Sequence, residues 1–203
     1  MRTRVLALAL TLLATTGCFG RAARYDPADP APEGQIVAPR ELPGEAIAPP
    51  VLPAELEERL VRFIRWRNRR LSPEQARHIA VALATASAAQ RLDHRLLACL
   101  VAVESSFDPR ARSRTGAAGL GQLLPSTARE LGVSDPHDVD QNLQGTALYL
   151  QRMLAAWDGR EDLALASYFE GLGTIRKQVA AGKPLTPAQI LFVQRVTGLY
   201  DRI

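Results

Sequence analysis

Residues 104–125 read ESSFDPRARSRTGAAGLGQLLP, and this stretch decides how the rest of the sequence is interpreted. It follows a nearly all-apolar run, LLACLVAV at residues 96–103, which predicts a buried helix. The run ends at a carboxylate, Glu104, and a glycine-rich segment comes soon after it. Burial disfavours the charged form of a carboxyl group and raises its pKa. The sequence therefore predicts an acid that stays protonated near neutral pH, beside a glycine-rich loop.

The end of this helix has a sequence signal of its own. Asp108 precedes Pro109, and a residue before proline is disfavoured in the α conformation, so we expect the helix to stop there. A protonated carboxyl group is the acid that glycosidic cleavage requires at the leaving oxygen. A surface glutamate at a frayed helix end is the alternative, and the position of Glu104 alone leaves both interpretations open.

The sequence beyond Glu55 is patterned for helices almost throughout. Residues 55–68 place apolar side chains on one helical face, and Ser72, Pro73 and Gln75 form a capping box with a first-position proline. No useful length alternates with the two-residue period of a β-strand. We therefore predict one all-α domain over residues 55–203, with further helices at 125–131, 138–157, 163–168 and 187–200.

The first 18 residues have the pattern of an export signal. Two arginines precede an apolar segment at residues 5–14 that is too short to span a bilayer, and two small residues precede Cys18. This pattern resembles a bacterial lipoprotein signal, in which the cysteine is lipidated, although Thr15 stands where such signals usually carry leucine. Ordinary cleavage and secretion is the alternative. Either way, residues 1–18 predict that the chain leaves the cytoplasm.

The next segment, residues 19–54, is predicted to be a disordered tether. Eight of the 14 prolines lie between Asp26 and Ala54, and each proline removes a backbone donor and fixes φ. A lipid anchor at Cys18 followed by such a tether suits a folded head that reaches away from a membrane. We therefore expect the protein on the periplasmic side of the cell envelope, anchored to the (outer) membrane.

Composition and charge narrow the possible partners. The net charge is +4, and six arginines lie within residues 59–70, which indicates either a solvated helix face or attraction to a polyanion. An exported chain without a nucleic-acid reader motif is a poor nucleic-acid binder, so the anionic cell envelope is the more natural partner. The three histidines lack metal-ligand spacing, and we expect no metal and no cofactor. Cys99 is expected to be an inert core residue.

Four segments, in order, resemble one known family. They are ESSFDP at 104–109, SRTGAAGLGQLLPSTARELGV at 113–133, NLQGTALYLQRML at 142–154 and LALASYFEGLG at 163–173. Each is a weak signal alone, but their order and spacing together are specific. They look like the soluble lytic transglycosylases, relatives of goose-type lysozyme, over about residues 76–177. The resemblance implies a lysozyme-like helical fold and peptidoglycan as the substrate.

The resemblance also implies a role for each matching residue. Glu104 matches the family's sole catalytic acid/base, which protonates the oxygen between N-acetylmuramic acid (MurNAc) and N-acetylglucosamine (GlcNAc). The same residue then takes the proton of the MurNAc 6-hydroxyl, which closes a 1,6-anhydro ring. Ser113 and Gln122 match residues that position the sugar, and Tyr168 matches a tyrosine that orients or supports the glutamate. Gly119 belongs to the glycines that let the backbone approach a sugar chain.

Three residues depart from the family pattern. Gly121 stands where most relatives carry methionine, and Phe169 stands where they carry an asparagine that contacts substrate. Glu170, which follows, is expected to point to solvent, or alternatively to activate water and shift the products toward hydrolysis. The sequence thus favours a monomeric, envelope-anchored lytic transglycosylase. A muramidase-type hydrolase and a non-catalytic peptidoglycan-binding lipoprotein with a degenerate cleft remain the alternatives.

Overall fold

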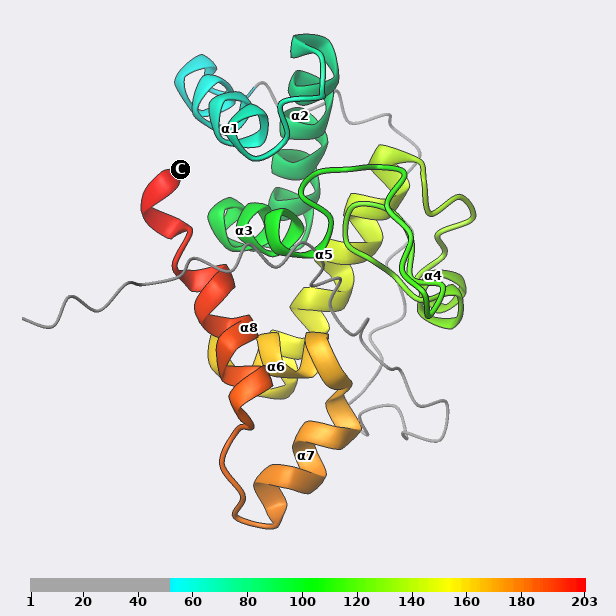
Figure 1. The fold of residues 1–203 in the computed structure, drawn as a ribbon, viewed down its shortest axis with the longest axis vertical. Helices are drawn as coiled ribbons and strands as arrows, with labels where there is room; N and C mark the ends of the chain where they lie inside the picture. Colours follow the sequence, from blue (N-terminus) through cyan, green and yellow to red (C-terminus); the bar gives the residue numbers. More distant parts are fainter. Residues whose placement is uncertain (1–51) are drawn as a thin grey trace, which may run out of the picture.

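The computed structural model describes residues 52–203, so the predicted signal at 1–18 and almost all of the predicted tether lie outside the described residues. The described part is built from helices, which confirms the predicted all-α class (Figure 1). Its only β-like pairings are isolated bridges from Ala118 to Arg112 and to Leu123. The helices are α1 Ala54–Arg67, α2 Pro73–Ala89, α3 His94–Glu104, α4 Pro125–Glu130, α5 Val139–Ala156, α6 Glu161–Glu170, α7 Leu172–Ala180, α8 Pro187–Thr197 and the 3-10 helix η1 Tyr200–Arg202.

Helix starts follow the capping signals in the sequence. The Ser72 hydroxyl accepts from the backbone N–H of Gln75, whose side chain bonds back to the backbone of Ser72, so the predicted capping box is confirmed. Thr186 and Gln189 form a second capping box at α8. Helix α7 was not predicted, because Gly171 and Gly173 mark this segment as a loop in the sequence. Gly171 instead takes φ 93° and turns the chain between α6 and α7.

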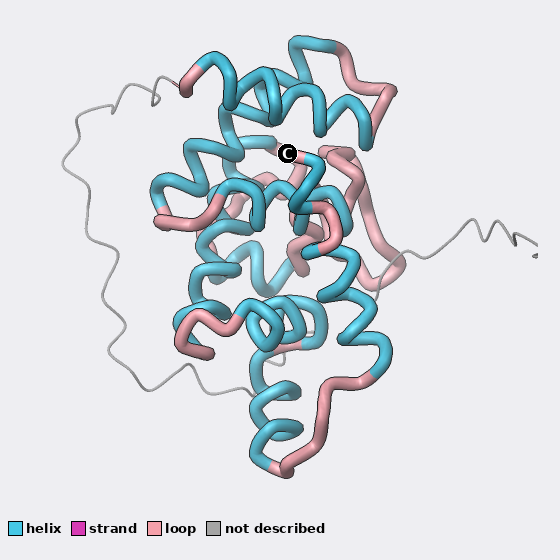
Figure 2. The backbone as a smooth tube through the Cα atoms, turned by 90° about the vertical axis from the view of Figure 1, so that its left-hand side faces the viewer, coloured by secondary structure: helices cyan, strands magenta, loops and turns pink. Residues whose placement is uncertain are grey.

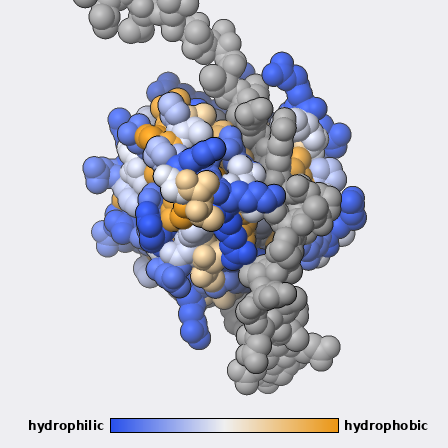
Figure 3. All heavy atoms as spheres, turned by 90° about the horizontal axis from the view of Figure 1, so that it is seen from below, coloured by the Kyte–Doolittle hydropathy of each residue, from blue (hydrophilic) through white to orange (hydrophobic). Residues whose placement is uncertain are grey.

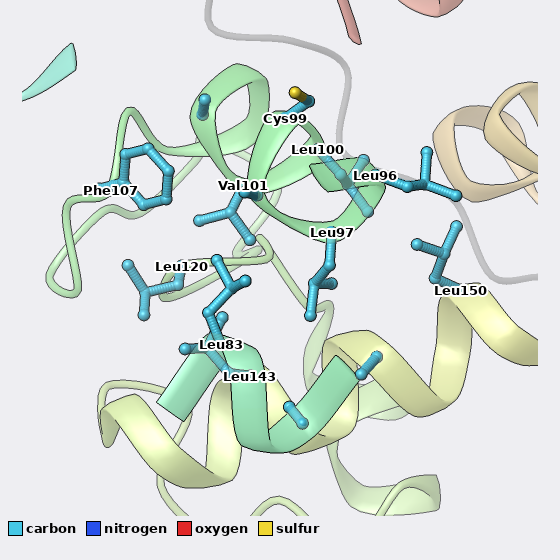
Figure 4. Packing of buried hydrophobic residues seen from close by; sticks show 14 of the residues in the cluster. Leu83, Leu96, Leu97, Cys99, Leu100, Val101, Phe107, Leu120, Leu143 and Leu150 are labelled. Atoms are coloured by element: carbon cyan, nitrogen blue, oxygen red, sulfur yellow. The ribbon is translucent and has the colours of Figure 1, made fainter. Parts of the chain in front are cut away.

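Helix α3 lies at the centre of the domain. Every residue from Leu96 to Ala102 is buried, as the apolar run predicts. In Figure 4 the α3 side chains Leu97 and Leu100 lie in one apolar cluster with Leu83 of α2 and Leu143 of α5. Because α3 is enclosed around its whole circumference, the position of its last residue is fixed by the surrounding helices.

The C-terminal helices return to the first ones. Helix α8 packs against α3 and α6, and the chain end lies next to α1 (Figures 1 and 2). The Arg59 guanidinium donates to the backbone oxygen of Ile203. The guanidinium of Arg202 stands 4.8 Å from the ring centroid of Trp66, which itself stacks on Phe63. Residues 198–203 therefore connect the C-terminal end of the domain to helix α1.

On the face that Figure 3 shows, the domain surface is mainly hydrophilic. The face seen in Figure 3 carries charged and polar side chains with small, separate apolar areas. None of the helices within residues 52–203 is both long and apolar enough to cross a bilayer. Cys99 is buried, and burial raises the pKa of its thiol to about 12, which fits the expected inert core residue.

Candidate active site

Glu104 is the last residue of α3, and the chain reverses immediately after it. Ser106 and Phe107 both have positive φ, 55° and 58°, a conformation that is costly for residues other than glycine. The turn is held because the Phe107 side chain is fully buried and meets the ring of Phe63 edge-on at 5.8 Å. The predicted stop at Asp108-Pro109 is therefore wrong by about one turn. Core anchoring of Phe107 ends the helix before the proline can act.

The surroundings of Glu104 favour its protonated form. Burial raises the pKa of the Glu104 carboxyl from its ordinary value of 4.5 to about 8, and the positive charge of Arg195 opposes the shift only in part. The side chain keeps a partly exposed surface despite this burial. A carboxyl group of this kind carries a proton at neutral pH and can still meet a ligand, as a general acid must.

The glycine-rich loop, residues 111–124, folds back on itself beside the end of α3. The N–H of Gly119 donates to the carbonyl of Ala111 at 2.9 Å, and Ala118 and Leu123 exchange both backbone hydrogen bonds. Gly119 has φ +76°, and a Cβ there would lie 1.9 Å from the carbonyl oxygen of Pro136. Only glycine fits this position, so the loop passes closer to its neighbours than any other residue would allow.

Gln122 holds the loop from inside. Its side chain is buried, and the amide nitrogen donates to the carbonyls of Gly119 at 3.0 Å and Ala111 at 3.3 Å. Its own backbone has φ 53°. The sequence predicted a side chain that binds sugar, whereas the amide N–H groups of Gln122 are engaged within the protein. Any effect of this nitrogen on a ligand would act through the loop that it shapes.

Helix α5 supplies the support that sequence reasoning missed. The side-chain oxygen of Asn142 accepts from the N–H of Gly121 at 2.8 Å, and its nitrogen donates to the carbonyls of Pro136 and Ala118. Thr146, one turn on, donates to the same oxygen at 3.3 Å. Asn142 is almost fully buried, so these bonds form out of contact with water. Asn142 is the first residue of the third motif segment, and this was the only sequence signal that it matters. The spacing of the motifs does not indicate which groups its side chain would bond.

Gly121 departs from the family pattern for a steric reason visible here. A Cβ at Gly121 would lie 1.8 Å from the hydroxyl oxygen of Thr146 and under 3 Å from two other atoms of that side chain. The space that a side chain would need is already filled from α5. In this chain the glycine and Thr146 therefore form a matched pair.

Tyr168 of α6 is linked to the glycine-rich loop and to Glu104. Its hydroxyl donates to the carbonyl of Gly121 at 2.7 Å, and its ring is buried beside the ring of Tyr149 at 5.0 Å. Burial raises the pKa of the Tyr168 hydroxyl, and the nearby carboxyl of Glu104 raises it further. Tyr168 therefore holds the glycine-rich loop and lies within electrostatic reach of Glu104.

Ser113 lies near the start of the glycine-rich loop and is partly exposed. Its hydroxyl accepts from the N–H of Ala117 at 3.0 Å and pairs with the hydroxyl of Thr115 at 2.9 Å. The serine thus closes a short turn within the loop. Among residues 52–203 no group of three or more histidine, cysteine, aspartate or glutamate side chains is arranged to hold a metal ion.

Phe169 and Glu170 belong to the contact between α6 and α8. The ring of Phe169 is buried and stacks on Phe192 with centroids 4.8 Å apart. The expectation that Glu170 points to solvent is wrong, because its carboxylate accepts from the side-chain nitrogen of Gln189 at 2.7 Å. Gln189 is fully buried and also bonds Gln178 of α7. Glu170 is partnered because the α7–α8 segment folds back over the end of α6, which no local sequence signal revealed.

A family comparison matches this arrangement. Residues 82–189 match the family model described as the transglycosylase SLT domain, and the chain belongs to this family. Membrane-bound lytic murein transglycosylase F of Desulfosudis oleivorans is 39% identical over 103 residues, which cover 47% of this chain and 23% of that relative. The transglycosylase of Enterobacteria phage PRD1 is 44% identical over 89 residues, 44% of this chain and 33% of the relative.

One solved structure supports the fold. An inactive glutamate-to-glutamine mutant of the lytic transglycosylase Slt from Pseudomonas aeruginosa superposes with a TM-score of 0.52 and 25% identity, over 59% of this chain and 22% of that one. The predicted lysozyme-like helical class is thereby confirmed. The chain spans about a quarter to a third of the length of the two curated relatives described above.

Proposed function

We propose that this chain is a peptidoglycan lytic transglycosylase that cleaves the β-1,4 bond between MurNAc and GlcNAc and leaves a 1,6-anhydromuramic acid end. One observation carries the proposal: a partly exposed glutamate ends a buried helix with its pKa raised to about 8 by burial. Membership of the SLT family and the activity in the names of the relatives support it.

Glu104 would act twice in this reaction. Its carboxyl proton passes to the bridging oxygen as the bond from the MurNAc anomeric carbon breaks, which releases the GlcNAc end as an alcohol. The resulting carboxylate then takes the proton of the MurNAc 6-hydroxyl, whose oxygen bonds to the anomeric carbon. Glu104 ends protonated again, and no water is consumed. The solved relative that is inactive with glutamine in place of a glutamate is consistent with such a role.

The remaining predicted site residues fit supporting roles. Gly119 and Ser113 belong to the loop that would contact the glycan, and Gln122 and Tyr168 hold this loop through their bonds to its carbonyls. Tyr168 would also limit the movement of Glu104. Because the amide nitrogen of Gln122 is used within the loop, its substitution should disturb glycan binding indirectly.

Two observations favour this function over its alternatives. An inverting hydrolase needs a second carboxylate to activate water, and Glu170 is instead bonded to Gln189. A degenerate, non-catalytic site was inferred from Phe169, but this residue packs against Phe192 and so serves the fold. Phe169 therefore has a role in packing, and the retained Glu104 favours an active enzyme over a degenerate one.

Digestion of purified peptidoglycan tests the proposal. The full chain, purified in detergent, should release 1,6-anhydromuropeptides, and Glu104→Gln should release none. Mass spectrometry separates the alternatives, because products of hydrolysis are heavier by one water. A reducing end in every product would establish the muramidase, and binding to sacculi without any soluble fragment would establish the non-catalytic lipoprotein.

The proposed anchoring rests on the first 54 residues. Cys18 would carry the lipid, residues 19–54 would be the tether, and a monomeric head would face the periplasm from the outer membrane. Labelling with radioactive palmitate in a bacterial host should mark the chain, and Cys18→Ser should abolish the label and release the protein into the soluble fraction. An unlabelled, soluble wild-type chain would establish ordinary secretion instead.

A further inference from the structure

The chain from α7 to α8 forms a hairpin that projects from the domain. Figure 1 shows α7 and its connection to α8 at the end farthest from α1, and the same projection is seen in Figure 2. The N–H of Lys183 donates to the carbonyl of Gln178 at 3.0 Å, which closes the end of α7. The side-chain nitrogen of Gln178 donates to the carbonyl of Pro184 and to the side chain of Gln189 on α8. These bonds hold the tip of the hairpin, residues 179–188, in a defined shape.

The charges of this hairpin are all positive. Residues 171–200 contain four basic residues and no aspartate or glutamate. Lys177 and Lys183 are exposed, and neither side chain forms an ion pair or a hydrogen bond with any residue that the structure describes. An arginine elsewhere in the domain does pair, since Arg152 lies 2.7 Å from the carboxylate of Glu130. The two lysines are therefore available to an external anion.

Both lysines line one surface cavity. The cavity has a volume of about 320 Å³, lies between α7 and the segment that leads to α8, and is also lined by Thr174 and Pro184. Ammonium groups bind phosphate oxygens as compact point charges, and a hydroxyl can donate to the same group. The cavity therefore has the chemistry of a site for a phosphate ester.

Exposed apolar side chains lie on the same hairpin. Among residues 52–203 four large apolar side chains are exposed, and three of them are Val179, Ile190 and Leu191; the fourth, Trp66, belongs to α1. Figure 3 looks onto the hairpin end from below and shows apolar areas among hydrophilic side chains. A folded protein would need a complementary hollow to cover a projection of this kind, whereas a fluid bilayer adapts to it. Apolar and basic side chains together match the surface of an anionic bilayer.

We propose that the α7–α8 hairpin docks the domain on an anionic phospholipid membrane. Lys177 and Lys183 hold the phosphate of a headgroup in their cavity, and Val179, Ile190 and Leu191 enter the boundary between headgroups and acyl chains. The long lysine side chains keep their charges among the headgroups while their stems lie beside apolar groups. The glycine-rich loop lies away from this tip in Figure 1, so docking leaves the candidate active site open.

Binding to vesicles tests the proposal. The full chain with Cys18→Ser is used, because a lipid on Cys18 would attach the protein to any bilayer. It is sedimented with vesicles of phosphatidylcholine, with or without phosphatidylglycerol. We expect at least about tenfold tighter binding where phosphatidylglycerol is present, and this preference should weaken as salt is added. Lys177→Gln combined with Lys183→Gln should weaken binding to the anionic vesicles about tenfold or more, and Leu191→Ser about fivefold.

A matched variant removes the same charge from the other end of the domain. Arg62→Gln combined with Arg69→Gln changes two exposed positions on and just after α1, and should leave the affinity unchanged. Equal losses for this variant and the lysine variant would overturn the proposal. Equal affinity for both kinds of vesicle would also overturn it and indicate an acidic protein as the occupant instead. Thermal unfolding should be the same for all these variants, because the substituted side chains are exposed.

A fluorescent label shows which end of the domain meets the bilayer. Cys99 is buried, so in the Cys18→Ser chain Ala181→Cys provides one accessible thiol at the tip. A dye on this thiol should shift its emission to shorter wavelength on the anionic vesicles, and a dye attached through Arg70→Cys near α1 should not. Sedimentation without a shift at the tip would refute docking by the hairpin. None of these measurements depends on glycan cleavage, so the proposed enzymatic function and this docking surface can fail separately.

Discussion

The raised pKa of Glu104 implies that the active site lowers the stability of the fold at alkaline pH. The folded pKa is about 8 and the ordinary value is 4.5, so between these two pH values the folded protein holds a proton that the unfolded chain has lost. The free energy of unfolding then falls by about 1.4 kcal/mol for each pH unit. From pH 5 to pH 8 this amounts to about 4 kcal/mol. Partial exposure of the side chain screens the effect, and we expect about 2–4 kcal/mol.

Glu104→Gln removes this pH-dependent fall in the free energy of unfolding, because an amide of the same shape stays neutral at every pH. The stability contribution of the protonated acid is fully present below pH 4.5 and is lost as pH rises through about 8. Wild type and variant should therefore have similar stability at pH 5. At pH 9 the inactive variant should be the more stable one by about 2–4 kcal/mol.

Urea unfolding at pH 5, 7 and 9 measures this difference directly, because other titrating groups cancel between two proteins that differ at one residue. Glu58→Gln, which removes an exposed carboxylate on α1, is the matched control and should follow the wild type within about 0.5 kcal/mol. The activity of the wild type should fall with an apparent pKa near 8 as its acid loses the proton. Parallel stability curves for wild type and Glu104→Gln from pH 5 to pH 9 would refute the reasoning.

Three further substitutions test the supports of the site by urea unfolding. Gly121→Ala should lower the stability by about 2 kcal/mol, because the new Cβ overlaps Thr146, and adding Thr146→Gly should restore part of the loss; no restoration would contradict the matched pair. Asn142→Ala leaves buried backbone groups without partners and should cost about 3 kcal/mol, so a loss under 1 kcal/mol would show that water replaces them. Phe169→Asn should cost about 3 kcal/mol through the lost stack on Phe192, and an unchanged unfolding midpoint would exclude Phe169 from the core.

The helices were predictable where their signals are local. The apolar run at residues 96–103 and the capping box at Ser72 depend on neighbours within one or two turns, and both were confirmed. Helix α7 was missed because its glycines are typical of loops, whereas tertiary contacts stabilise the segment as a helix: it packs on α6, and Gln178 bonds to Gln189 of α8. The end of α3 was misplaced because a buried Phe107, rather than the proline, sets the turn.

In the candidate site, too, some features follow from the local sequence and others depend on tertiary packing. The sequence determined that Glu104 follows an apolar helical run, that a glycine-rich segment comes after it and that a tyrosine comes later in the motif order, since all of this lies in residue type and spacing. Only the tertiary structure decided what holds the site. Asn142, Thr146 and Tyr168 meet at one glycine, Gly121. Such partners lie far apart in the chain, and their bonds depend on how the helices pack, which no local pattern encodes.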